Sequence, residues 1–79
     1  MWIRSQDLTV LAKFQGIYID SRFSLWTDGY LLGEYSSKNK AIDVLNLIEK
    51  CLIEYQSDYV FYMPEDKEID EFQLWRKKI

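Results

Sequence analysis

The chain has 79 residues and a formal net charge of −3, from 10 basic and 13 acidic residues. Its length predicts a single domain over residues 1–79, and its negative charge argues against non-specific nucleic-acid binding, which depends on phosphate neutralisation. The chain has no histidine and one cysteine, Cys51. This composition excludes imidazole catalysis, a zinc site built on a cysteine pair and an intramolecular disulfide.

Residues 1–35 are predicted to form five short strands. β-branched and aromatic residues recur there between short polar turns, which is the usual pattern of strands. The expected strands cover residues 2–5, 9–14, 16–19, 23–27 and 30–35. The first two could form a hairpin, because the serine and aspartate between them favour a turn.

The dipeptide Asp28-Gly29 predicts a two-residue hairpin, since both residues tolerate positive φ. Such a turn fixes the register, and the expected pairs are Thr27 with Tyr30, Trp26 with Leu31 and Leu25 with Leu32.

The two faces of this hairpin are predicted to have different roles. One face is expected to pack on the helix, and it carries Phe23, Leu25 and Leu32. The opposite face carries Trp26, Leu31 and Tyr35. This second face is too apolar for an ordinary solvated sheet. It is either an interaction surface or a surface that the C-terminal part of the chain covers.

A single amphipathic helix is predicted over residues 37–56. Its apolar side chains recur at intervals of three and four residues and share one face: Ala41, Val44, Leu45, Ile48, Cys51, Leu52 and Tyr55. Either Ser36 or Ser37 is a suitable N-cap, because a hydroxyl can accept from the free N–H groups of the first turn. Three further apolar residues either flank the core or contact a partner: Ile42, Leu47 and Ile53.

After the helix, residues 59–63 are predicted to form a strand with Val60 and Tyr62 on one face. Pro64 ends this strand, because proline has no N–H for a sheet ladder. Residues 65–78 are predicted to form a short helix, whose Trp75 is expected to dock on its own domain or on a neighbour. The whole pattern predicts an α+β fold, in which a mostly antiparallel sheet of about five to six short strands packs on one long helix.

The start of the long helix is a candidate anion site. The N–H groups of a first turn attract anions such as phosphate, and the polar residues around them are Ser36, Ser37, Lys38 and Lys40. Tyr30 and Tyr35 are near enough in sequence to flank a base or a ribose. Two such helix starts could form one pocket in a homo-oligomer. The alternative is ordinary capping with surface lysines.

No catalytic, cofactor or metal site is expected, because an enzyme without histidine would depend on carboxylates, lysine or tyrosine alone. The acidic residues between 65 and 71 lack the spacing and central glycine of a calcium loop. Cys51 is interpreted as a small buried hydrophobe in a reducing cytoplasm. The first residues are too polar for a signal peptide, and no stretch approaches the roughly 18 apolar residues of a membrane span. A cytoplasmic protein without membrane contact is expected.

Four segments of the sequence resemble a family of small uncharacterised proteins that are common in phages, prophages and mobile elements of low-GC Gram-positive bacteria. They are the opening Met1-Trp2-Ile3-Arg4-Ser5-Gln6-Asp7, the central Leu32-Gly33-Glu34-Tyr35-Ser36-Ser37, the helix pattern of Ala41, Val44, Leu45 and Ile48, and Met63-Pro64-Glu65-Asp66. The resemblance extends to about Asp66. It implies an α+β fold and a mobile-element setting, and it implies no activity and no residue roles.

Three functions remain open from the sequence. The first is a non-catalytic, phage-type protein that counteracts a host defence or regulatory factor by stoichiometric protein–protein binding, with the interface residues Trp26, Leu31, Tyr35, Phe72 and Trp75. The second is a homo-oligomer that sequesters a small phosphorylated or nucleotide signal at the helix start. The third, which the net charge makes the weakest, is a nucleic-acid-binding regulator that uses Arg4, Lys13 and Arg22.

Overall fold

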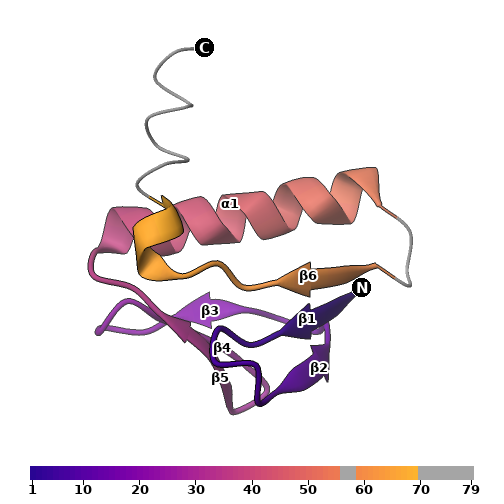
Figure 1. The fold of residues 1–79 in the computed structure, drawn as a ribbon, viewed down its shortest axis with the longest axis horizontal. Coiled ribbons are helices and arrows are strands. Elements are labelled where there is room, and N and C mark those ends of the chain that lie inside the picture. The colour runs from indigo at the N-terminus through magenta and orange to yellow at the C-terminus, as the bar shows by residue number, and fades with distance from the viewer. Residues whose placement is uncertain (56–58, 70–79) are drawn as a thin grey trace.

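The computed structural model describes residues 1–55 and 59–69. Within these ranges, six short strands and one helix of 17 residues form an α+β fold (Figure 1). The predicted fold class is confirmed. The strands, however, are divided between two three-stranded sheets instead of joining in one sheet.

Sheet A consists of β1 (Trp2–Arg4), β2 (Leu11–Lys13) and β6 (Val60–Tyr62), in the order β2-β1-β6. β1 and β2 are antiparallel, as the predicted hairpin requires, whereas β6 pairs with β1 in parallel. The turn between β1 and β2 is held by Ser5, whose hydroxyl donates to Asp7 and accepts from the N–H of Val10. β1 is therefore the central strand, and its Ile3 is fully buried.

Sheet B consists of β3 (Tyr18–Ile19), β4 (Ser24–Thr27) and β5 (Tyr30–Glu34), which are all antiparallel. Asp28 has a φ of 46° and Gly29 a φ of 81°, which are the left-handed values that a two-residue hairpin turn needs. The predicted pairs Thr27–Tyr30 and Trp26–Leu31 are both present.

A β-bulge changes the register beyond Trp26. Leu25 pairs with Gly33, so the predicted Leu25–Leu32 pair is wrong. The bulge leaves Leu32 as an extra residue on β5. Its side chain still reaches the core, and Leu25 and Leu32 are 0% and 1% exposed. Glycine suits position 33, because a Cβ there would lie 3.1 Å from the Tyr35 Oη atom, which is closer than an ordinary van der Waals contact.

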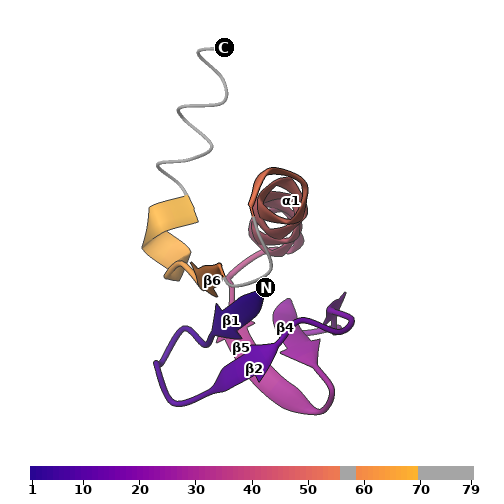
Figure 2. The same cartoon turned by 90° about the vertical axis from the view of Figure 1, so that its right-hand side faces the viewer.

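The helix α1 (Lys38–Glu54) lies above both sheets. Figure 2 looks along its axis and shows β6 and β1 on one side below it, with β4 on the other. The face of α1 that points toward the strands contributes Ala41, Val44 and Ile48 to the core, and each of them is at most 1% exposed. Because these residues repeat at helical spacing, the predicted apolar face is the face that packs.

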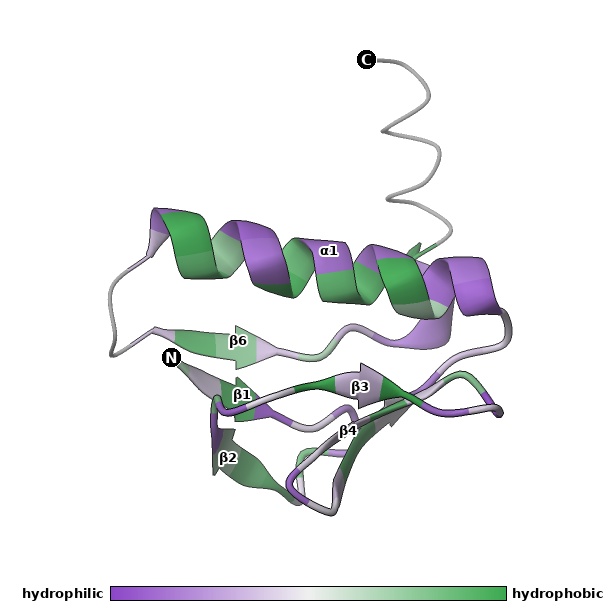
Figure 3. Cartoon of the chain, turned by 180° about the vertical axis from the view of Figure 1, so that it is seen from behind, coloured by the Kyte–Doolittle hydropathy of each residue, from purple (hydrophilic) through white to green (hydrophobic). Residues whose placement is uncertain are grey.

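The C-terminal turns of α1 leave this core. Their ribbon still carries green bands among purple ones in the hydropathy colouring of Figure 3, and Leu52 and Ile53 are exposed. Ile53 is 79% exposed, whereas Leu47, also predicted off the main face, packs against the core. Tyr55 is half exposed and stacks on Tyr59, with 4.4 Å between the ring centroids.

After β6 the chain turns at Pro64, and residues 66–69 form a helical turn that buries Ile69 completely. The rest of the predicted tail helix lies outside the described residues, together with the interface candidates Phe72 and Trp75.

Candidate functional site

Three segments that are far apart in the sequence meet close to the start of α1. Gln6 follows β1, Glu34 ends β5, and Pro64 follows β6. The N–H of Glu34 donates to the Gln6 side chain at 3.1 Å, and the Gln6 amide donates to the carbonyl oxygens of Glu34 and Pro64 at 3.3 and 3.1 Å. The hydroxyl of Tyr35 donates to the same Pro64 carbonyl at 2.7 Å. This network joins the end of β5 in sheet B to the segments that follow the parallel strands β1 and β6 of sheet A, so these residues are primarily structural.

The Tyr35 hydroxyl provides a direct test of this junction. Replacing Tyr35 by phenylalanine is expected to lower the free energy of unfolding by about 1–2 kcal/mol, because it removes a buried hydrogen bond and leaves a buried carbonyl with one partner fewer. Thermal unfolding should show a melting point lower by roughly 4–8 °C per kcal/mol. Tyr30→Phe is the matched control, since Tyr30 is 55% exposed. Equal melting points for the two variants would contradict this role of the junction.

The predicted anion site at the start of α1 is already occupied by a carboxylate of the same chain. Ser37 is the N-cap and accepts from the N–H of Lys40, as capping predicts. Asp66 accepts from the N–H of Ser36 at 2.8 Å and pairs with the Lys40 ammonium at 3.1 Å. A phosphate would have to displace Asp66 from these donors. Of the two lysines in the predicted set, Lys38 is exposed and Lys40 is partly buried.

The two tyrosines that were predicted to flank this site do not flank it together. Tyr30 begins β5 and Tyr35 follows its end, so the length of the strand separates them. Tyr35 is 5% exposed and belongs to the core. Burial raises the pKa of its hydroxyl well above the ordinary tyrosine value, and the charges of Asp66 and Glu68 add to this effect. Tyr35 therefore offers no ring face to a ligand in this structure.

Acid titration should reveal the Asp66 contact. The Ser36 N–H holds the pKa of Asp66 below its ordinary value, and Lys40 contributes further. Because folding lowers this pKa, the stabilisation is present above the unfolded-state value of about 3.9 and is lost as pH falls through the folded-state value. Asp66→Asn should therefore cost at most about 1 kcal/mol at pH 7, since the carboxylate is partly exposed. In urea unfolding this cost should shrink progressively as pH falls below the unfolded-state pKa of about 3.9; a cost that does not change with pH would contradict the assignment.

The predicted interface on sheet B is much smaller than expected. Tyr35 is buried beneath the segment that carries Pro64, so the alternative of a covered face holds for this part. Trp26 is partly buried, and its indole N–H donates to Asp20 at 2.8 Å. Leu31 is the most exposed of the three, at 36%. No continuous aromatic surface is left among these residues.

A larger exposed surface lies on the side of sheet A that faces away from the core. Paired residues of neighbouring strands share one face. Ala12 and Phe61 each pair with Ile3 and share its face. Ile3 and Phe61 belong to the core, so this face points inward. The residues on either side of them point outward and form what we call the outer face of sheet A: Trp2, Arg4, Leu11, Lys13, Val60 and Tyr62.

This outer face combines exposed aromatic and apolar groups with positive charge. Trp2 is 39%, Leu11 53% and Tyr62 63% exposed. Its two charged residues, Arg4 and Lys13, are both basic, although the chain as a whole is acidic. Arg4 and Lys13, which are two of the three residues of the nucleic-acid hypothesis, thus lie on the same face of sheet A. Arg22 lies in the turn before β4 on the other sheet.

One pattern in the sequence indicates part of this surface. The alternation in residues 59–63 predicts that Val60 and Tyr62 lie on the same face. The structure confirms this and shows that the face points outward. What could not be predicted was that β6 would pair with β1 and so bring Tyr62 beside Arg4, from the opposite end of the chain.

Within residues 1–55 and 59–69, no group of three or more Cys, Asp or Glu side chains is placed to hold a metal ion. Burial raises the pKa of the Cys51 thiol, which makes its reactive thiolate form scarcer. In the same part of the chain, no helix has both the length and the apolar character needed to span a membrane.

Comparisons with protein-family models, with curated proteins and with solved structures find no match to this chain.

Proposed function

We propose that this protein is a non-catalytic binding protein that acts by stoichiometric contact with another protein, and that it docks through the outer face of sheet A. The observation that carries the proposal is the cross-strand surface of Trp2, Arg4, Leu11, Lys13, Val60 and Tyr62. Aromatic residues and arginine are the groups that protein interfaces favour, and monomers rarely expose so many large apolar side chains together.

The charges on this face define the chemistry of the partner. Arg4 and Lys13 sit among apolar and aromatic neighbours, and the face contains no acidic residue. A protein surface with an apolar centre and acidic groups beside it would complement both features. The resemblance to small phage and prophage proteins supports a partner that is a factor of host defence or host regulation.

A second candidate is favoured by the same residues. Trp2 pairs laterally with Lys13, and Arg4 pairs laterally with Tyr62. A cation beside an aromatic ring can hold a phosphate while a base stacks on the ring. A homo-oligomer that sequesters a small phosphorylated or nucleotide signal would then use this face. The start of α1 is the less suitable place, because Asp66 occupies it.

Native mass spectrometry of the protein, purified under non-denaturing conditions from the cells that produce it, distinguishes these functions. A retained second protein in fixed ratio supports the binding protein. A homo-oligomer with an added mass of nucleotide size on each subunit supports the second candidate. A fixed complex that Trp2→Ala leaves intact would contradict docking through the outer face.

A further inference from the structure

β2 is an edge strand of sheet A, and no other strand of the described residues lies along its outer side. Antiparallel strands alternate the direction of their main-chain groups from one residue to the next. The carbonyl of Val10 and the N–H of Phe14 are bonded on the side of β1. The N–H and carbonyl groups of Leu11 and Lys13 therefore point the other way, so the free edge of β2 offers both donors and acceptors.

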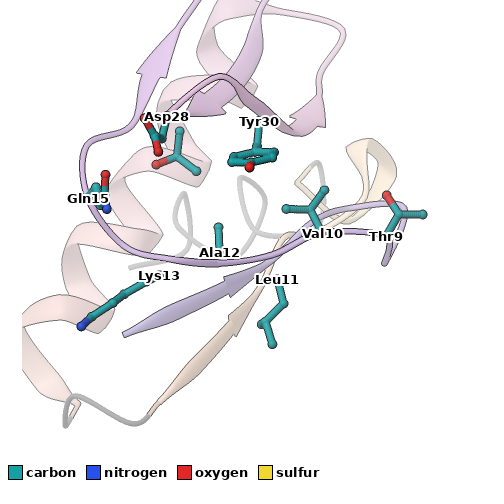
Figure 4. Close-up of a pocket in the computed structure, with 9 residues that line it drawn as sticks. Thr9, Val10, Leu11, Ala12, Lys13, Gln15, Asp28 and Tyr30 are labelled. Atoms are coloured by element: carbon teal, nitrogen blue, oxygen red, sulfur yellow. The ribbon is translucent and has the colours of Figure 1, made fainter.

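A groove of about 380 Å³ runs beside this edge, between β2 and the hairpin of β4 and β5. One wall is formed by residues 9–13 and Gln15, and the other by Thr27, Asp28 and Tyr30. Figure 4 shows Ala12 directed toward the Tyr30 ring, with Gln15 beyond one end of this pair and Thr9 beyond the other. The groove thus follows β2, with apolar groups at its centre and polar groups at its ends.

The free edge and the groove together favour an extended peptide as the occupant. The edge carries donors and acceptors at the spacing of an extended chain, and another extended main chain can supply an acceptor for each donor and a donor for each acceptor. A small cation would leave the N–H groups of Leu11 and Lys13 without partners, and an anion would leave their carbonyls without partners. Addition of an extended segment to an exposed sheet edge is a common way for proteins to bind peptides.

Antiparallel pairing fixes where the side chains of an added segment lie. The residues opposite Lys13 and Leu11 exchange both main-chain bonds with β2, and their side chains lie on the outer face of sheet A. The residue between them is opposite Ala12, so its side chain enters the groove on the side of Tyr30, where an apolar group fits. In Figure 4, Leu11 projects from the opposite side of the strand, as this alternation requires. An added strand therefore extends the outer face and fills the groove at the same time.

The charges beside this edge distinguish a partner protein from a second copy of this chain. Arg4 and Lys13 are the charged residues of the outer face, and both are basic. Two copies that paired through β2 would bring the Arg4 and Lys13 of both copies onto one continuous face, which opposes self-association. Lysine on an edge strand is a common guard against such pairing. An acidic side chain opposite Lys13 forms a cross-strand ion pair instead, so the edge favours an acidic segment of another protein.

We propose that β2 accepts an extended segment of the partner protein as an additional antiparallel strand. The segment presents an acidic residue to Lys13, an apolar residue to Ala12 and a second apolar residue to Leu11. This inference rests on the proposed function, because it takes the partner to be a protein, and it names the element of the partner that makes the contact. The added strand is continuous with the outer face, where Trp2 on β1 is the neighbour of Lys13.

The test is an NMR titration of the full ¹⁵N-labelled chain with the blocked peptide acetyl-Thr-Glu-Val-Val-Thr-amide. Antiparallel pairing places its glutamate opposite Lys13 and its valines opposite Ala12 and Leu11. Saturable shifts and slower hydrogen exchange are expected at the amides of Leu11 and Lys13, with a dissociation constant of about 0.5–5 mM, since so short a peptide forms few main-chain bonds. The Ala12 amide, which faces β1, should change less. No saturable change at Leu11 and Lys13 would overturn the proposal.

Two methylated peptides show whether the main chain makes the contact. N-methylation of the valine opposite Leu11 removes a donor that faces β2, and it should weaken binding at least about fivefold. N-methylation of the valine opposite Ala12 removes an N–H that points away from β2, and it should change the affinity by no more than about twofold. Equal losses for the two methylated peptides would contradict strand addition.

Lys13→Glu tests the charge of the segment. This variant should bind the glutamate peptide at least about fivefold more weakly than the original chain does, and it should prefer the analogue with lysine in place of glutamate. Lys50→Glu makes the same charge change at an exposed lysine of α1 and should leave the affinity within about twofold. Equal effects of the two variants would contradict the ion pair at β2.

Two further measurements separate strand addition from self-association and from the outer face alone. Shifts of the Leu11 and Lys13 amides that depend on the concentration of the free chain would show pairing between copies, and would overturn the assignment of this edge to a partner. Tyr62 lies on β6, at the other edge of sheet A, so Tyr62→Ala should leave peptide binding unchanged. A loss of partner affinity in Tyr62→Ala without any peptide binding at β2 would retain docking through the outer face and refute strand addition. Peptide binding at β2 with an unchanged partner affinity in Tyr62→Ala would refute the outer face and retain strand addition.

Discussion

Replacing Ile48 by alanine is expected to lower the free energy of unfolding by about 3–4 kcal/mol, which is among the largest single effects that this small domain can show. Ile48 is 1% exposed in the middle of α1 and belongs to the core that joins the helix to both sheets. Truncation removes buried methyl groups and leaves a cavity that the surrounding strands cannot fill completely. Total stability is expected to be on the order of 4–12 kcal/mol, so about a quarter or more of it should be lost.

The helix supplies its own control for this measurement. Ile53 lies on α1 as well, but it is 79% exposed. Ile53→Ala should therefore change the stability by no more than about 0.5 kcal/mol. Urea unfolding of both variants measures the difference, and the dependence on urea should remain unchanged if both fold to the same structure. Comparable losses at the two positions would mean that α1 does not pack on the strands through its Ile48 face.

Much of the local structure could be predicted because the signals lie within short segments. The Asp28-Gly29 turn, the Ser37 cap and the helical spacing of Ala41, Val44 and Ile48 each depend on neighbouring residues only. All six strands fall within the predicted ranges for the same reason. Alternation along one strand says nothing about its partner, however, so the division into two sheets could not be predicted.

The bulge in sheet B changes a register that the hairpin turn alone would have set. The hairpin turn set the first two pairs, as predicted, but Gly33 rather than Leu32 pairs with Leu25. The Tyr35 ring lies against position 33, where a Cβ would come within 3.1 Å of the tyrosine hydroxyl oxygen. Tyr35 is in turn held by Pro64, which is 29 positions further along the chain.

The two candidate sites also depend on contacts between segments that are far apart in the sequence. At the start of α1, the predicted anion site, the N–H of Ser36 donates to the carboxylate of Asp66, which lies 30 positions further along the chain. The outer face of sheet A was missed because β1, β2 and β6 contribute only two outward-pointing residues each. Segments so short show no clear periodicity, and their common surface exists only once the strands have paired.

Simultaneous replacement of Trp2 and Tyr62 by alanine is expected to weaken partner binding by about 100-fold or more. Both side chains are exposed on the outer face of sheet A, from adjacent strands. Aromatic residues near the centre of an interface commonly contribute about 2 kcal/mol or more each, and 1.4 kcal/mol corresponds to a tenfold change in affinity. Stability should change little, because neither residue belongs to the core. Circular dichroism at the working temperature checks that the variant remains folded.

Isothermal titration of the recovered partner with Tyr62→Ala and Tyr18→Ala tests the docking face most directly. The two tyrosines have similar exposure, 63% and 55%, but Tyr62 is on sheet A and Tyr18 is on sheet B. Docking through the outer face predicts that Tyr62→Ala lowers the affinity at least about tenfold, while Tyr18→Ala leaves it within about twofold of the original chain. An unchanged affinity for Tyr62→Ala with a large loss for Tyr18→Ala would place the partner on sheet B and contradict the proposed docking face.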